Sequence, residues 1–172
     1  MALSPTFSAD VEEYTAGTSN ATDKVTATAD ESLTISIELN GAEFTNGSDA
    51  TWDAGENTLE ITVTNSASAS KVYTVTITKA PAAKLSGLTI GALTLTPTFD
   101  ADETEYTVTT SNNSNKVTAT AAEGLEIALD LDGTEIENES SPSWETGDNV
   151  LTVTVSNEIG ESEEYVVTVT KE

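Results

Sequence analysis

Apolar and polar residues alternate with a period of two along most of the chain. In residues 33–39, every second residue is Leu or Ile, which marks one face of a strand. The same alternation recurs in residues 24–29, 59–63 and 72–79, where Val, Ile, Leu, Ala and Tyr alternate mainly with Thr. Threonine suits the solvent face of a pleated strand because it is β-branched and carries a hydroxyl. No segment shows a helical period, so the pattern predicts short strands throughout.

Turn signals separate these strands. Asn40-Gly41 and Asp132-Gly133 are Asx-Gly pairs, which supply the positive φ angles of a tight hairpin. Residues 53–57, directly after Trp52, are also predicted to form a turn before the strand at 59–63. Each copy of the pattern therefore holds six or seven short strands within some 80 to 90 residues, which is typical of a β-sandwich.

The chain repeats itself. Leu3 to Lys79 matches Leu95 to Lys171 without a gap, so each residue of the first copy corresponds to the residue 92 positions later. KVTATA recurs unchanged, and LSPTFSADVEEYT becomes LTPTFDADETEYT. A period this long is a whole domain with its own core rather than one unit of a solenoid.

The predicted fold class is all-β, with two tandem antiparallel immunoglobulin-like β-sandwiches. Residues 1–80 form the first repeat, which lacks the first strand, and residues 85–172 form the second. Residues 81–84 form a linker with one proline and no glycine, so we expect a stiff connection and sandwiches stacked end to end.

The second copy carries a recognisable set of motifs: LSGLTIGALTLTPTFDADETEYTV, then VTATA, GDNVLTVTVSN and YVVTVTK. These motifs resemble the bacterial cadherin-like β-sandwich family, and the first copy lacks only the opening LSGLTIGA. The resemblance implies an immunoglobulin-like fold. It also implies a spacer, adhesion or decoration module, because members occur as repeats in bacterial cell-surface proteins and in bacteriophage virion proteins. No catalytic residues come with the family.

The amino-acid composition excludes several classes of function and partner. Thirty Asp and Glu residues stand against six Lys and no Arg, giving a net charge of −24. Nucleic acid is excluded as a partner because phosphate binding needs clustered cations, and an anionic membrane is excluded for the same reason. Cysteine and histidine are absent, which removes the usual nucleophilic dyads and zinc sites. We therefore predict no enzyme, no catalytic or metal-binding residues, no cofactor and no membrane insertion.

Three groups of residues are candidates for a site. Trp52 and Trp144 could stack on a cell-surface glycan, but their matching places in both copies favour a core role. The tyrosine pairs, Tyr14 with Tyr106 and Tyr73 with Tyr165, have the same interpretation, and the first pair could form hydrogen-bonded corners. The acidic clusters 100–103 and 130–133 suggest calcium, but the first copy has Ser8 and Asn40 where the second has Asp100 and Asp132.

The sequence thus predicts a non-enzymatic structural or binding module displayed on a surface. The first hypothesis is a virion component, a capsid decoration or tail-surface protein, since residues 1–5 show no signal peptide. The alternative is a fragment of a bacterial cell-surface adhesin, located outside the cell. The expected partner is a protein of the capsid, the tail or another surface assembly.

The missing strand suggests how such a partner could attach. Residues 85–90 have no counterpart ahead of Met1, so the first repeat should have an unfilled groove and an unpaired edge, beside the ladder of residues 73–77. Such an edge favours strand complementation by another chain.

Overall fold

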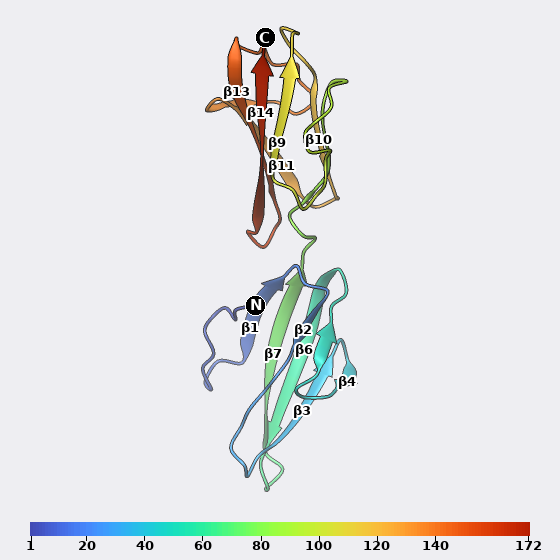
Figure 1. The fold of residues 1–172 in the computed structure, drawn as a ribbon. Coiled ribbons are helices and arrows are strands. Elements are labelled where there is room, and N and C mark those ends of the chain that lie inside the picture. Colours follow the sequence, from blue (N-terminus) through green and yellow to red (C-terminus); the bar gives the residue numbers. More distant parts are fainter. The chain divides into compact units, whose positions relative to one another are not determined.

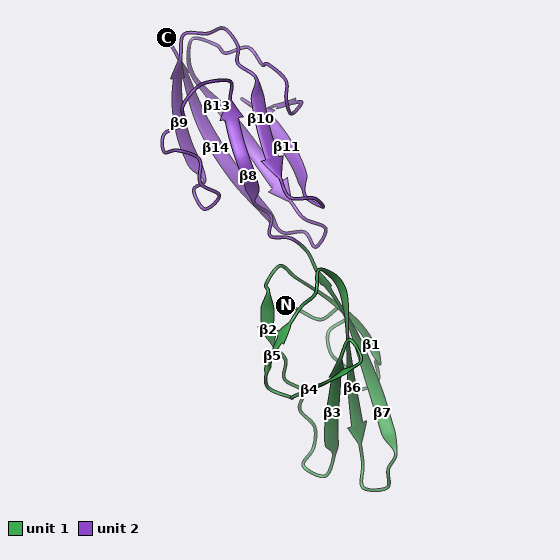
Figure 2. Cartoon of the chain, turned by 90° about the vertical axis from the view of Figure 1, so that its right-hand side faces the viewer, with its two compact units in different colours: residues 1–80 green, residues 81–172 purple.

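The computed structural model describes residues 1–172, and the chain divides into two compact units, residues 1–80 and 81–172 (Figure 2). All its elements are β-strands, seven in each unit, so the predicted all-β class is confirmed (Figure 1). The structure contains no helix that could span a membrane.

The first unit is a five-stranded sheet faced by a small two-stranded layer. The large sheet has the order β1-β7-β6-β3-β4, and β2 and β5 form the second layer. The strands are β1 (Glu13–Thr18), β2 (Thr22–Lys24), β3 (Thr34–Leu39), β4 (Ala42–Phe44), β5 (Asp49–Thr51), β6 (Gly55–Thr64) and β7 (Ser70–Lys79).

The second unit repeats the large sheet but builds its second layer differently. The order is β12-β11-β13-β14-β9, and the small layer consists of β10 and β8. The strands are β8 (Leu85–Ile90), β9 (Glu105–Thr110), β10 (Val117–Ala121), β11 (Glu126–Leu131), β12 (Thr134–Ile136), β13 (Gly147–Ser156) and β14 (Ser162–Lys171). In place of the β2–β5 pair, the second unit has a single β-bridge between Ser114 and Ser143.

One pair of strands in each five-stranded sheet is parallel, which differs from the fully antiparallel sandwich expected from the sequence. β1 runs parallel to β7, and β9 runs parallel to β14. In the second unit the reason is visible in the chain path: β8 pairs in the small layer, and the chain then crosses to the edge of the large sheet as β9. A strand that arrives by such a crossover can run in the same direction as its neighbour.

The Asx-Gly hairpins are confirmed. Asn40 and Gly41 have φ angles of 51° and 79°, and Asp132 and Gly133 have 50° and 83°. Asn40 accepts a hydrogen bond from the backbone of Thr58, which fixes the turn against β6. The turn predicted at 53–57 is shorter than expected, because β6 already begins at Gly55.

Each unit has its own core, and the two tryptophans lie within them. Trp52 is 4% exposed and Trp144 1% exposed, so the predicted core role is confirmed and neither ring is free to stack on a sugar. Their indole nitrogens donate to matching side chains, Trp52 to Asp23 at 2.9 Å and Trp144 to Asn115 at 3.0 Å.

The tyrosine corners are also confirmed. The hydroxyl of Tyr14 donates to the carbonyl oxygens of Ser8 and Val11, at 2.6 and 2.9 Å. The hydroxyl of Tyr106 makes the same pair of bonds to Asp100 and Glu103, at 2.6 and 2.7 Å. Both tyrosines are buried, so each corner ties the loop ahead of the edge strand to the core.

Because Trp52 donates a hydrogen bond to Asp23, we expect the stability of the first unit to fall at low pH. Burial raises the pKa of Asp23, but hydrogen bonds from Asn20, Thr18 and Trp52 outweigh it and hold the pKa below its ordinary value. A depressed carboxyl pKa stabilises the fold above the ordinary Asp pKa of about 3.9, and this contribution is lost as the pH falls through the lower, folded-state value.

In an NMR titration over pH, we therefore expect the chemical shift of the Trp52 indole N–H to change as Asp23 is protonated. The midpoint pH of this change should lie below the pKa of an ordinary aspartate. The signal of Trp144 should stay still, because its acceptor, Asn115, does not titrate. An Asp23→Asn variant is the matched control and should abolish the movement. Equal movement of both signals in the parent chain would contradict this assignment.

Candidate functional site

The first strand of the second unit completes its small layer. β8 pairs antiparallel with β10, with Ile90 opposite Val117 and Leu88 opposite Ala119. Leu85, Leu88 and Ile90 are 1%, 3% and 0% exposed, so β8 closes the core as well as the ladder (Figure 2).

No strand among residues 1–80 corresponds to β8, and the segment equivalent to β10 has no ladder. Residues 25–29, which correspond to β10, belong to no strand, so the strand predicted at 24–29 is wrong: β2 ends at Lys24. On one side, the segment is held by Ser48 and Asn46, which bond to the backbones of Val25 and Ala27. On the other side, no backbone hydrogen bond involves Thr26 or Thr28. We call residues 25–29 the open edge.

Five apolar side chains of the first unit are more exposed than their counterparts in the second unit. Leu3 is 37% exposed whereas Leu95 is 6% exposed. Four further residues of the first unit are half-buried where the matching residue is buried: Ala27 for Ala119, Ile61 for Val153, Val63 for Val155 and Tyr73 for Tyr165. The two copies share the same order of strands in the large sheet, so the difference in exposure is not a difference in that sheet.

The open edge does not lie where the sequence placed it. The sequence suggested an unpaired edge beside residues 73–77, but these belong to β7, which is paired with β1 on one side and β6 on the other. The free edge lies in the small layer, opposite the large sheet, because the counterpart strand β8 pairs with β10 and not with β14.

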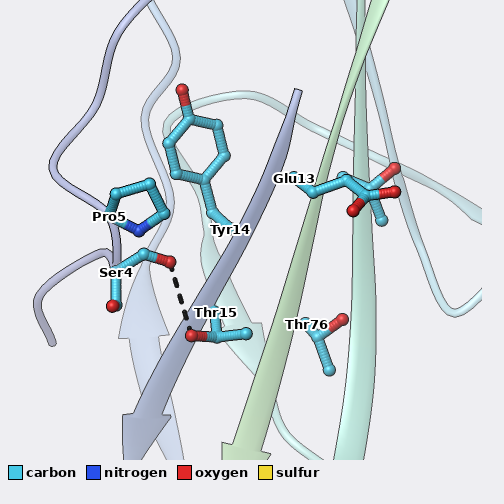
Figure 3. Close-up of a pocket in the computed structure, with 7 residues that line it drawn as sticks. Ser4, Pro5, Glu13, Tyr14, Thr15 and Thr76 are labelled. Atoms are coloured by element: carbon cyan, nitrogen blue, oxygen red, sulfur yellow. Dashed lines mark hydrogen bonds between the residues drawn. The ribbon is translucent and has the colours of Figure 1, made fainter. Parts of the chain in front are cut away.

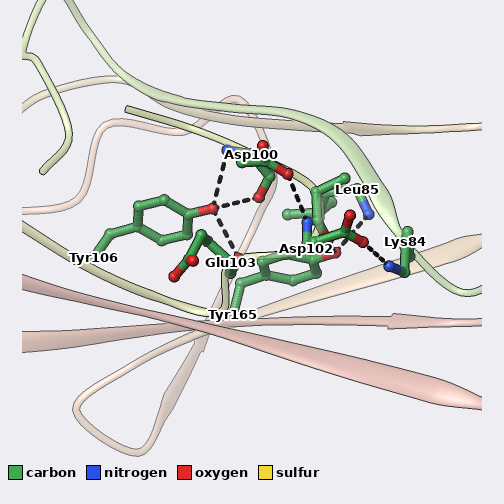
Figure 4. Close-up of polar contacts among 8 residues, drawn as sticks. Lys84, Leu85, Asp100, Asp102, Glu103, Tyr106 and Tyr165 are labelled. Atoms are coloured by element: carbon green, nitrogen blue, oxygen red, sulfur yellow. Dashed lines mark hydrogen bonds and ion pairs between the residues drawn. The ribbon is translucent and has the colours of Figure 1, made fainter. Parts of the chain in front are cut away.

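Figure 4 shows how β8 enters the second unit. The backbone N–H of Leu85 donates to the hydroxyl of Tyr165 at 3.2 Å, and that hydroxyl donates to the carbonyl oxygen of Ala101 at 2.9 Å. Burial raises the pKa of Tyr165. Just ahead of the strand, Lys84 pairs with Asp102, and this hydrogen bond raises the pKa of Lys84.

In the first unit Tyr73 corresponds to Tyr165, and it keeps only some of the hydrogen bonds that Tyr165 makes. Tyr73 still donates to the carbonyl oxygen of Ala9, at 3.1 Å, but no backbone N–H donates to its hydroxyl. The ammonium of Lys71 also donates to Ala9 and lies 5.2 Å from the Tyr73 ring, so it supplies a cation here. Phe7 lies 5.9 Å from the same ring and is 60% exposed.

A shallow hollow of about 480 Å³ lies on the outer face of β1 and β7. Its lining includes the hydroxyls of Thr15, Thr74 and Thr76 together with Glu13 (Figure 3).

The acidic clusters considered for calcium are engaged in local structure. Asp130 accepts a bond from the backbone of Gly133, and Asp132 accepts one from Val150. Asp102 is the partner of Lys84. No group of three or more acidic side chains converges on a point where it could hold a metal ion.

The family can now be assigned. The sequence profile described as "Cadherin-like beta sandwich domain" matches residues 1–80 and again residues 90–172. The chain belongs to the cadherin-like β-sandwich family. The two matches coincide closely with the two compact units, so this is a tandem of cadherin-like domains, of which the first has an open edge.

Several solved structures resemble this cadherin-like tandem at low sequence identity. Fibronectin(III)-like modules of Clostridium thermocellum CbhA are 12% identical, with a TM-score of 0.36, over 95% of this chain and 92% of that one. Bacteroides ovatus SGBP-B, solved with a mixed-linkage heptasaccharide, is 14% identical, with a TM-score of 0.34, over 98% of this chain and 46% of that one.

Drosophila N-cadherin EC1-4 is 12% identical, with a TM-score of 0.34, over 94% of this chain and 48% of that one. The cadherin-like tandem therefore spans about half the length of the last two proteins. No curated protein matches the sequence.

Proposed function

We propose that this chain is a non-enzymatic structural or binding module displayed on a surface, and that the surface is a bacteriophage virion. In that setting it serves as a capsid decoration or tail-surface protein, held by a protein of the assembly. The observation that carries the proposal is the tandem of two cadherin-like β-sandwiches, each a compact unit with its own core, which is a form suited to a repeated surface module.

The surface charge is consistent with display. Thirty carboxylates against six lysines keep copies of a β-rich protein apart by repulsion, which counters the tendency of free strand edges to aggregate. The same charge disfavours contact with packaged nucleic acid or anionic lipid, so the proposed partner is a protein.

The alternative function is a repeat pair within a bacterial cell-surface adhesin. Tandem cadherin-like domains suit a spacer or adhesion array. Exposed Phe7, beside Tyr73, is the one large aromatic ring of the chain that a glycan could stack on.

Immunogold electron microscopy tests the proposal. An antibody raised against the 172-residue chain is applied to purified phage particles and to uninfected cells of the source organism. We expect regularly spaced label on the particles. Label confined to the cell envelope, with bare particles, would support the adhesin and overturn the virion assignment.

A further inference from the structure

We propose that each unit is a load-bearing link, in which the parallel pairing of an edge strand with the last strand resists tension along the chain. The pairs are β1 with β7 and β9 with β14, and the arrows of each pair point the same way in Figure 1. This inference goes beyond display on a surface, and it applies equally to a virion and to a cell envelope. A displayed module that is held at one end is pulled at the other whenever its partner moves, so resistance to tension adds a function to display.

The direction of pairing decides how tension reaches the hydrogen bonds. In the second unit the ladder begins with Glu105 opposite Val166. It ends with Thr110 opposite Lys171. The chain enters β9 at the first end and leaves β14 at the second, so tension pulls the two strands past each other along their length. In an antiparallel pair both points would lie at the same end, and tension would peel the strands apart bond by bond.

The parallel ladder loads several hydrogen bonds at once. The backbone N–H of Val166 donates to the carbonyl oxygen of Thr104 at 2.7 Å, and this bond closes one end. The N–H of Glu172 donates to the carbonyl oxygen of Thr110 at 3.0 Å and closes the other. Between them, the bonds of a parallel pair are evenly spaced. Sliding must lengthen all of these bonds together, so each one carries only a share of the load.

The first unit has the same ladder with the same closing bonds. The N–H of Thr74 donates to the carbonyl oxygen of Glu12 at 2.7 Å, and the N–H of Ala80 donates to that of Thr18 at 3.0 Å. In each unit six residue pairs lie in register between the edge strand and the last strand. Every bond of the first ladder lies within residues 12–80, so the ladder does not depend on the chain ahead of it.

The core prevents β9 from slipping along β14. Tyr106, Val108 and Thr110 are buried, and they alternate with exposed residues. A slip by one residue would turn the exposed set toward the core. A slip by two would draw the ring of Tyr106 away from the carbonyl oxygens of Asp100 and Glu103, to which its hydroxyl donates. The strand therefore has no neighbouring register in which it could relax under load.

The end of the edge strand is also held to the core tryptophan. The hydroxyl of Thr110 donates to the Oδ1 atom of Asn115 at 3.3 Å, and the same atom accepts the indole N–H of Trp144 at 3.0 Å. In the first unit β1 ends in the same arrangement, with Asp23 as the shared acceptor. The last residue of each ladder is thus fixed to the interior of its unit as well as to the neighbouring strand.

Optical tweezers on the full 172-residue chain test the inference in the second unit. The chain has no cysteine, so two introduced cysteines are unique attachment points. Glu103→Cys with Glu172→Cys puts the handles at opposite ends of the β9–β14 ladder, whereas Ser111→Cys with Glu172→Cys puts both at the same end. Neither geometry pulls on β8. All three side chains are exposed, so both variants should keep the melting temperatures of the parent chain.

At the same pulling speed, we expect the opposite-end geometry to unfold the second unit at a force at least about threefold higher, because its bonds yield together instead of singly. In both geometries this unfolding releases about 200 Å of chain, which identifies the event. Equal forces, or a higher force in the same-end geometry, overturn the proposal. Because the immunogold experiment reads location alone, failure of the load-bearing proposal and failure of the virion proposal are distinguishable.

Discussion

Replacing Trp52 with alanine is expected to lower the free energy of unfolding of the first unit by about 3–5 kcal/mol. The ring is 4% exposed and belongs to the first core. Its removal leaves a cavity and also takes the indole donor away from Asp23. Differential scanning calorimetry of the full chain measures the effect as a downward shift of one of two transitions.

Trp144→Ala is the matched control, because it should shift the other transition by a similar amount. Trp144 is 1% exposed, and its indole bonds to a neutral side chain, Asn115. If each variant kept the parent melting profile, the two rings would not be the centres of the two cores, and the assignment of both tryptophans to structure would be wrong.

Fusing a copy of residues 84–92 directly ahead of Met1 is expected to raise the melting temperature of the first unit by about 10–20 °C. The added strand would bury side chains that copy Leu85, Leu88 and Ile90, each contributing about 1.5–3 kcal/mol, and its new backbone hydrogen bonds offset part of the conformational entropy lost in ordering it. A net gain of about 2–3 kcal/mol corresponds to that shift for a domain of this size, at about 4–8 °C for each kcal/mol.

The control for the fusion changes the added leucine that copies Leu88 to aspartate. Leu88 is 3% exposed in its own unit, so a carboxylate at the copied position should cancel the gain. Equal melting temperatures for the fusion, its aspartate variant and the parent chain would show that the open edge does not accept this strand in cis.

Much of the fold can be predicted from the sequence because its signals are local or repeated. The Asx-Gly pairs force positive φ at Asn40 and Asp132, and the alternation in residues 33–39 and 72–79 corresponds to β3 and β7. The burial of both tryptophans follows from their equivalent places in two copies of one domain. The family resemblance is confirmed by the profile match, whose second region begins at residue 90, within the opening motif LSGLTIGA.

The position of the open edge could not be predicted, because alternation identifies a strand without naming its neighbours. Residues 25–29 and 117–121 share the sequence VTATA, yet only the second copy forms a strand there. The difference is the strand β8, which pairs with residues 117–121 and not with residues 25–29. The parallel β1–β7 pair was missed for the same reason: direction depends on the path of the connecting chain.

The place of β7 and β14 in their sheets sets the order in which this protein can fold. Each is the last strand of its unit along the chain, yet each lies between two others, β7 between β1 and β6 and β14 between β13 and β9. The edge strand β1 meets its partner only across a long span of chain, from Glu13 to Thr74. During synthesis, the early strands of each unit therefore remain without their central neighbour until the final strand leaves the ribosome, and such non-local closure makes folding slow.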